Sequence, residues 1–162
     1  MKTFLGSLCA KSYHFGVVVS RFNEFITRRL LQSAVETLRQ AGVPEKRIQI
    51  VWVPGALEIP FYCKKLATRK KIHGLIALAC VIRGDTYHFE CVAHEVTRGI
   101  SQVALETQVP VATGILTVDN LEQAIDRAGL KSGNKGAQAA LTALEIVNLN
   151  RLLGKNNRMK AS

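Results

Sequence analysis

The sequence lacks the features that typify membrane, secreted and zinc-binding proteins. No apolar run approaches the roughly 18 residues that a membrane-spanning helix needs, and the apolar stretch from Phe4 to Ala10 is too short and broken for a secretory signal. The four cysteines form no Cys-x-x-Cys pair, and no histidine stands at zinc-finger spacing from them. We therefore expect a cytoplasmic protein with reduced cysteines, no disulfide and no bound metal.

Aromatic residues and acidic residues are both scarce. Aromatics make up 6% of the 162 residues, and 12 acidic residues face 22 lysines and arginines, which gives a formal net charge of +10. Such an excess attracts anions of several classes, from nucleic acids to phosphorylated metabolites. No motif interleaves basic with aromatic side chains as single-stranded nucleic-acid sites do, so we expect no nucleic-acid partner. The basic runs at 64–71 and 155–160 are typical of a solvated helix end and a frayed terminus.

No internal repeat and no linker divides the chain, so the sequence predicts one domain over residues 1–162. A chain of this length buries roughly 70% of its extended surface on folding. We expect an N-terminal arm at residues 1–12 and a disordered basic tail at 154–162.

Predicted strands and helices alternate along the chain. The apolar patterns predict strands at His14–Ser20, Ile48–Val53, Gly74–Val81 and Val109–Thr117. They predict helices at 23–41 with Asn23 as the cap, from about Glu58, from about Phe89, at 119–128 with Asp119 as the cap, and at 134–153. Repeated β-α-β units of this kind favour a parallel sheet with helices on both faces.

Ligands of such sheets bind at the carboxyl ends of the strands. This rule directs attention to residues 21–23, 54–58, 80–88 and 113–117. In the third segment, Gly84 frees the backbone to turn into a helix, where outward amides and the Thr86 hydroxyl would suit an anion. The alternative is a simple helix cap by Asp85 or Thr86. His88 ends the loop and could transfer protons near neutral pH, although a histidine near a helix start is often structural.

Two further features allow both a functional and a structural interpretation. Arg127, Lys131 and Lys135 lie in a glycine-rich junction, where they could hold a phosphate or simply complement a helix C-terminus. Phe22 directly follows a predicted strand, and it could stack on a planar ring or pack against the next helix.

Taken together in order, these segments resemble the lumazine synthase family. The resemblance covers about residues 13 to 153 and is carried by four strings: Arg21-Phe22-Asn23; Pro54-Gly55-Ala56-Leu57-Glu58-Ile59-Pro60; Val81-Ile82-Arg83-Gly84-Asp85-Thr86 with His88-Phe89; and Gln123-Ala124 through Arg127-Ala128-Gly129 to Gly133-Asn134-Lys135-Gly136. The resemblance implies a flavodoxin-like three-layer sandwich with a four-stranded parallel sheet.

The resemblance also implies an activity. In this family a ribitylaminouracil, 5-amino-6-(D-ribitylamino)uracil, condenses with a four-carbon sugar phosphate, 3,4-dihydroxy-2-butanone 4-phosphate. The products are 6,7-dimethyl-8-ribityllumazine, phosphate and water, and neither a metal nor an organic cofactor is needed. The active sites lie between the neighbouring subunits of a homo-pentamer.

Site residues follow from the same resemblance. It implies that His88 transfers protons and that Phe22 stacks on the pyrimidine, with Arg127 binding phosphate from the adjacent subunit. The remaining substrate-binding positions implied in this way are Asn23, Ala56, Leu57, Glu58, Cys80, Val81, Ile82, Asp85, Thr86, Thr113 and Lys135.

The chain departs from the family pattern at two positions. Thr113 stands where members commonly carry a phenylalanine that closes over the pyrimidine, and Leu57 also replaces a more usual phenylalanine. The junction 129–133 carries no insertion, which resembles members that form icosahedral shells of sixty subunits, and riboflavin synthase is a candidate partner. The alternatives are an archaeal-type riboflavin synthase and an inactive flavin-binding shell protein.

Overall fold

A computed structural model describes residues 1–10, 12–129 and 133–159 of the chain. Its four strands form one parallel sheet in the order β2-β1-β3-β4. The strands are β1 (Phe15–Ser20), β2 (Ile48–Val53), β3 (Gly74–Ile82) and β4 (Val111–Val118). The helices are α1 (Glu24–Gln40), α2 (Ile59–Ala67), α3 (His88–Thr107), α4 (Leu121–Arg127) and α5 (Lys135–Met159), with a short 3-10 helix at Glu45–Arg47.

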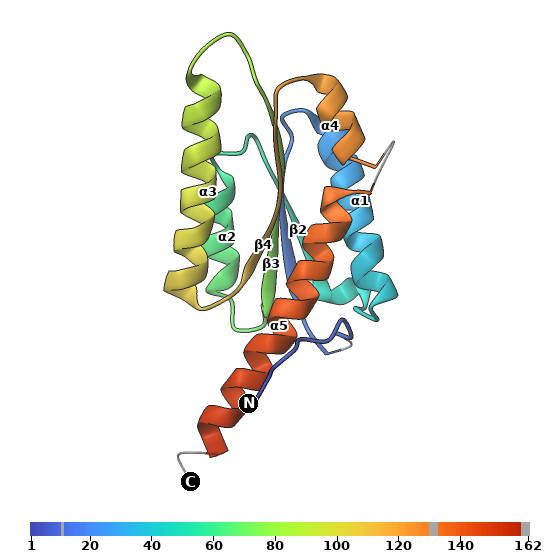
Figure 1. Cartoon of the computed structure of the whole chain (residues 1–162), viewed down its shortest axis with the longest axis vertical. Helices are drawn as coiled ribbons and strands as arrows, with labels where there is room; N and C mark the ends of the chain where they lie inside the picture. The colour runs from blue at the N-terminus through green and yellow to red at the C-terminus, as the bar shows by residue number, and fades with distance from the viewer. Residues whose placement is uncertain (11, 130–132, 160–162) are drawn as a thin grey trace.

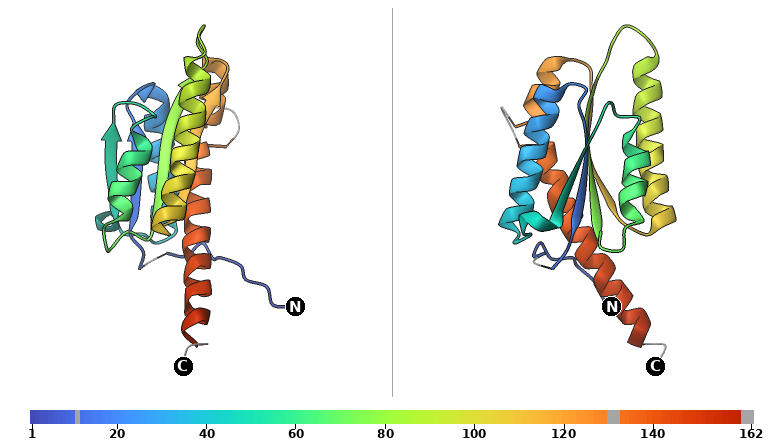
Figure 2. Two further views of the ribbon diagram at one scale, coloured as in Figure 1. Left: turned by 90° about the vertical axis from the view of Figure 1, so that its left-hand side faces the viewer. Right: turned by 180° about the vertical axis from the view of Figure 1, so that it is seen from behind.

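The helices cover both faces of the sheet. Helices α2 and α3 lie on one face, and α1, α4 and α5 lie on the other (Figure 1). The view from behind agrees with this arrangement (Figure 2). The flavodoxin-like three-layer sandwich predicted from the sequence is therefore confirmed.

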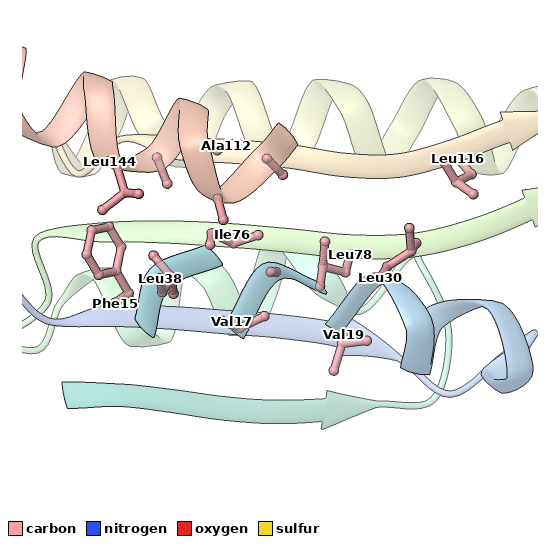
Figure 3. Close-up of a cluster of buried hydrophobic side chains, with 14 of the residues drawn as sticks. Phe15, Val17, Val19, Leu30, Leu38, Ile76, Leu78, Ala112, Leu116 and Leu144 are labelled. Carbon is pink, nitrogen blue, oxygen red and sulfur yellow. The ribbon is translucent and has the colours of Figure 1, made fainter. Parts of the chain in front are cut away.

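The two central strands carry the core. All six residues of β1 and the first seven of β3 are buried, because each strand has a neighbour on both edges and helices on both faces. Figure 3 shows one of the two apolar layers, in which Phe15, Val17 and Val19 lie near Leu30 and Leu38 of α1. The other layer packs β3 against α2 and α3.

Strand β4 lies at an edge of the sheet, and its residues alternate in burial. Ala112, Gly114, Leu116 and Val118 are buried, whereas Thr113 and Thr117 are exposed. One face of β4 is thus only partly covered by the helices of its own chain.

Helix α5 approaches α1 closely at Gly136. A Cβ atom at this position would lie 2.0 Å from the carbonyl oxygen of Leu30. Only glycine allows the two helices to meet at this distance, which explains the glycine that follows Lys135 in the sequence.

Three local predictions are wrong. Asn23 precedes α1 as expected but has a left-handed backbone and does not cap it, and Asn120 rather than Asp119 caps α4 by accepting a hydrogen bond from the Gln123 amide at 2.9 Å. Helix α5 continues to Met159 instead of ending near Leu153, so the predicted tail begins as part of this helix. No glycine in a left-handed conformation and no proline stops it there.

Both ends of the described chain lie at the end of the sheet where the strands begin (Figure 1). The N-terminal arm and the last turns of α5 extend beyond this end of the sheet, away from the carboxyl ends of the strands (Figures 1 and 2). In the described part of the chain, no helix has the length and apolar character that crossing a membrane requires.

Candidate active site

A pocket of about 340 Å³ opens at the carboxyl end of the sheet, on the side of α2 and α3. Three connections surround it, those that follow β1, β2 and β3. Most of its lining is apolar: Phe22, Gly55, Ala56, Leu57, Glu58, Cys80, Val81, Ile82, Gly84, Thr86, His88, Phe89 and Val92. Nine of the fourteen site residues predicted from the sequence thus border one pocket.

Phe22 is 70% exposed, and its backbone is held firmly. Its amide donates to the carbonyl of Pro54 at 3.1 Å, and the Arg21 amide donates to that of Val53 at 2.8 Å. These bonds continue the β1–β2 pairing past the ends of the strands. An aromatic ring that is exposed on a fixed backbone is well suited to stack on a planar ligand.

Asn23 does not line the pocket but joins two of its walls. Its Nδ2 donates to the carbonyl oxygen of Cys80 at 2.9 Å, which ties the end of β1 to the end of β3. Asparagine tolerates the left-handed backbone found here (φ 57°) better than most residues. The side chain acts on the neighbouring backbone rather than on the pocket directly.

The connection after β2 is closed by Glu58. Its Oε2 accepts a hydrogen bond from the Gly55 amide at 2.8 Å, which folds the segment between them into a tight turn. Ala56 is buried inside this turn, whereas Leu57 is 47% exposed. The turn therefore presents Leu57 and the backbone around it to a ligand.

The connection after β3 leaves the start of α3 open. Tyr87 occupies the cap position and no side chain accepts a hydrogen bond there, so the predicted alternative of a cap by Asp85 or Thr86 is wrong. Thr86 and His88 line the pocket, whereas Asp85 does not. A helix start with free amides, beside a threonine hydroxyl and a histidine, favours an anion.

Arg127 and Lys135 lie apart from this pocket. They border a separate hollow of about 390 Å³, together with Asp126, Gly133 and Gln138. Arg127 donates to the carbonyl of Gln123 at 3.3 Å and Lys135 to the Oε1 of Gln138 at 2.8 Å. Helix α4, which carries Arg127, covers the opposite face of the sheet from α3 (Figure 1). The predicted Lys131 lies outside the described residues.

A comparison of the sequence with a family model identifies the family of the chain. Residues 12–151, which are most of the chain, match the family model of 6,7-dimethyl-8-ribityllumazine synthase. The chain belongs to the lumazine synthase family. Membership connects it with riboflavin biosynthesis and with a family of transferases.

Thr113 is another predicted site residue that lies outside the pocket of the single chain. Thr113 lies on β4 and pairs with Ala77 of β3. Four residues further along β4, Thr117 pairs with the pocket residue Val81. Four residues of a strand span roughly 13 Å. The exposed Thr113 side chain accepts a hydrogen bond from the Ile115 amide at 3.4 Å and does not reach the pocket of its own chain.

Cys80 lines the pocket as a thiol and not as a thiolate. Burial raises its pKa to about 12, so at neutral pH the group is a protonated thiol and a poor nucleophile. Within the described ranges, no three histidine, cysteine or acidic side chains lie close enough together to hold a metal ion.

Arg83 is a residue whose importance the sequence did not reveal. Its Nε donates to Asp119 at 3.0 Å, its Nη1 donates to Glu90, and its guanidinium lies 4.2 Å from the centre of the Phe89 ring. These hydrogen bonds lower the pKa values of both carboxyl groups. Arg83 therefore fixes the loop before His88 to the end of β4. The contact with Asp119 spans 36 positions, and no local pattern indicates it.

Proposed function

We propose that this chain is a lumazine synthase that condenses 5-amino-6-(D-ribitylamino)uracil with 3,4-dihydroxy-2-butanone 4-phosphate. The products are 6,7-dimethyl-8-ribityllumazine, phosphate and water. The observation that carries the proposal is the single pocket that gathers Phe22, the turn closed by Glu58, Thr86 and His88 in a member of this family.

The pyrimidine would bind against the apolar part of the pocket. Phe22 offers the face of a ring, and Val81 and Ile82 border the same space from the end of β3. The ribityl chain would lie along residues 56–58, whose turn presents backbone groups at the mouth of the pocket. Aromatic stacking and apolar contacts would orient the ring, and the few polar groups would set its direction.

The phosphate of the second substrate would bind at the start of α3. The uncapped amides there and the Thr86 hydroxyl supply donors, and the open surroundings of Gly84 leave room for the group. Arg127 and Lys135 line a different hollow in the same chain, so they would reach this phosphate from a neighbouring subunit. The proposal therefore includes a homo-oligomer, which we take to be a pentamer, with a sixty-subunit shell as its larger form.

The reaction needs proton transfers and close positioning. The aromatic amine attacks the ketone, a Schiff base forms with loss of one water, phosphate leaves, and the ring closes with loss of a second water. Holding two reactants in register lowers such barriers by up to roughly 7–11 kcal/mol, and a positioned acid or base adds about 10²–10⁴-fold. His88 borders the pocket beside Thr86 and would supply the proton transfers. No step is an oxidation or a reduction, so the chemistry requires no redox cofactor.

The purified protein incubated with both substrates tests the proposal. We expect the absorbance and fluorescence of the lumazine to appear. Conversion of added lumazine into riboflavin would instead indicate a riboflavin synthase. Flavin binding with no turnover of either substrate would indicate an inactive flavin-binding shell protein. Sedimentation of the active protein measures the assembly, and a monomer that turns over at full rate would contradict a site shared between subunits.

A further inference from the structure

A second cavity lies at the opposite end of the sheet from the pocket. It has a volume of about 600 Å³ and lies where the chain enters β1, where β3 begins and where α5 passes the sheet edge. Its lining mixes polar and apolar surface: Ser12, Tyr13, His73, Val147, Asn150, Arg151 and Gly154. Figure 2 shows α5 continuing past this edge. No part of the proposed reaction uses these residues.

Tyr13 organises the cavity. Its side chain is buried, and its hydroxyl donates to Oδ1 of Asn148 at 3.3 Å and accepts from Nη1 of Arg151 at 3.3 Å. The guanidinium carbon of Arg151 lies 5.8 Å from the centre of the Tyr13 ring. Arg151 is thus held at the cavity by one of its five N–H groups, and the others are available to a ligand.

His73 is held in a defined orientation. Its ring centre lies 5.3 Å from that of Tyr13, and its Nδ1 accepts a hydrogen bond from the His14 amide at 3.1 Å. A neutral imidazole that accepts through Nδ1 carries its proton on Nε2. A second backbone contact, with the Lys71 carbonyl, also acts on the ring, so His73 is held by the backbone from two sides.

The charges around the cavity are of one sign. Burial lowers the pKa of His73 most strongly, and Arg47 and Arg151 lower it further, against an opposing effect of the Lys71 carbonyl. Burial, Arg47, His73 and Lys71 lower the pKa of His14. In the part of the chain that the structure describes, no carboxylate pairs with Arg151. A cavity bordered by an arginine and close to further cations attracts an anion.

We propose that this basal cavity binds a phosphate group, either as free phosphate or as the phosphate of a small ester. Arg151 offers the planar donor set that matches phosphate oxygens. The Ser12 hydroxyl and the Asn150 amide, whose Nδ2 also donates to the Gln108 carbonyl at 3.5 Å, add neutral donors around the same space. The volume exceeds that of a bare ion and lies in the range of sites for small molecules.

Equilibrium dialysis of the full chain against radiolabelled inorganic phosphate, at constant ionic strength, tests the proposal. We expect Arg151→Gln to weaken one phosphate site per chain by ~10-fold or more, as the loss of a charge-assisted hydrogen bond predicts. The matched control is Arg98→Gln, which removes the same charge from an exposed ion pair with Glu95 on α3. Equal binding by Arg151→Gln and the control would overturn the proposal.

A second variant guards against an effect of Arg151→Gln on folding. Asn150→Asp places a carboxylate at the cavity from an exposed position of α5 and leaves Tyr13 and Arg151 in place. It should weaken the same site, and unchanged binding by a folded Asn150→Asp protein would contradict the proposal. Arg127→Gln should weaken phosphate binding at the proposed reaction site and leave binding at the basal cavity unchanged. The two sites, and failure of either proposal, are therefore distinguishable.

Competition identifies the form of the ligand. Displacement of the label by glycerol 3-phosphate at a lower concentration than by unlabelled phosphate supports an ester, and displacement by both at equal concentration supports free phosphate. Displacement by chloride at an equal concentration would show general charge screening and would overturn the site.

Discussion

His88 stands at the first position of α3, and in the described structure its exposed side chain has no hydrogen-bond partner. We expect His88→Ala to lower kcat by ~10²-fold or more and to leave the assembly intact, because the lost proton transfer is worth that much. His94→Ala is the control, since His94 lies on the same helix and does not border the pocket. Steady-state kinetics measure kcat of the two variants. Equal kcat values for His88→Ala and His94→Ala would remove His88 from the mechanism.

Arg127 forms no ion pair within 4 Å among the described residues, although its charge, after the hydrogen bond from Arg83, helps to lower the pKa of Asp119. We expect Arg127→Ala to raise the KM of the sugar phosphate by ~10-fold or more while the KM of the uracil changes little, because the guanidinium would contact only the phosphate. Arg98→Ala, on α3, controls for the loss of one positive charge. A KM for the sugar phosphate equal to that of the control would require a different phosphate site.

At the residue scale, motifs predict which residues line the pocket better than they predict contacts within the protein. Phe22, Leu57 and His88 could be predicted because each follows a strand at the edge where parallel sheets bind ligands. The hydrogen bond from Asn23 to Cys80 could not, because it joins positions 57 apart and depends on a left-handed backbone. The hydrogen bond from Arg83 to Asp119 could not be predicted either, because it joins positions 36 apart.

At the scale of elements, a side-chain cap positions the helix that carries Arg127. The Oδ1 of Asn120 accepts from the Gln123 amide at 2.9 Å. Asn120→Ala should lower the free energy of unfolding by about 1 kcal/mol, because α4 loses this acceptor. Asn120→Asp keeps an acceptor and should stay near the wild type. Urea unfolding compares them, and equal stability of the two variants would show that the cap contributes nothing.

The packing of α5 on α1 depends on a missing side chain. Gly136→Ala would bring a Cβ atom against the Leu30 carbonyl, so we expect a loss of stability of about 1–3 kcal/mol, as overpacking generally causes. Gly84→Ala is the matched control, since a Cβ there meets nothing within 4 Å. Thermal unfolding of both proteins measures the difference, and equal melting temperatures would mean that α5 shifts without cost.

Strands and helices could largely be predicted from periodicity, whereas their ends could not. The strand ranges agree to within two residues, because buried β-branched runs are a strong signal. The cap of α4 was assigned to Asp119 because aspartate and asparagine are both good caps, and only the backbone decides between neighbours. Gly154 offers a stop signal after Leu153, but its backbone is not left-handed and α5 continues through it to Met159.

At the scale of the whole molecule, His14 and His73 connect stability to pH. Burial and nearby cations lower both pKa values below the ordinary 6.5. Between the lowered values and 6.5 the unfolded chain binds more protons, so the free energy of unfolding rises with pH and falls as the pH drops below 6.5.

Urea unfolding at pH 7.5 and pH 5.5, followed by Trp52 fluorescence, measures this effect. The wild type should be less stable at pH 5.5, and His14→Gln/His73→Gln should show a smaller difference between the two pH values. His94→Gln should behave as the wild type does. A pH dependence that survives the double substitution would place its origin elsewhere.

The location of both chain ends bears on how the protein could be used. The arm and the last turns of α5 leave from the sheet edge opposite the pocket (Figure 1). A fluorescent reporter or an affinity handle fused to either end would therefore sit far from the entrance through which substrates arrive. Lumazine formation by such a fusion should match that of the untagged protein, so both ends are suitable for attaching cargo.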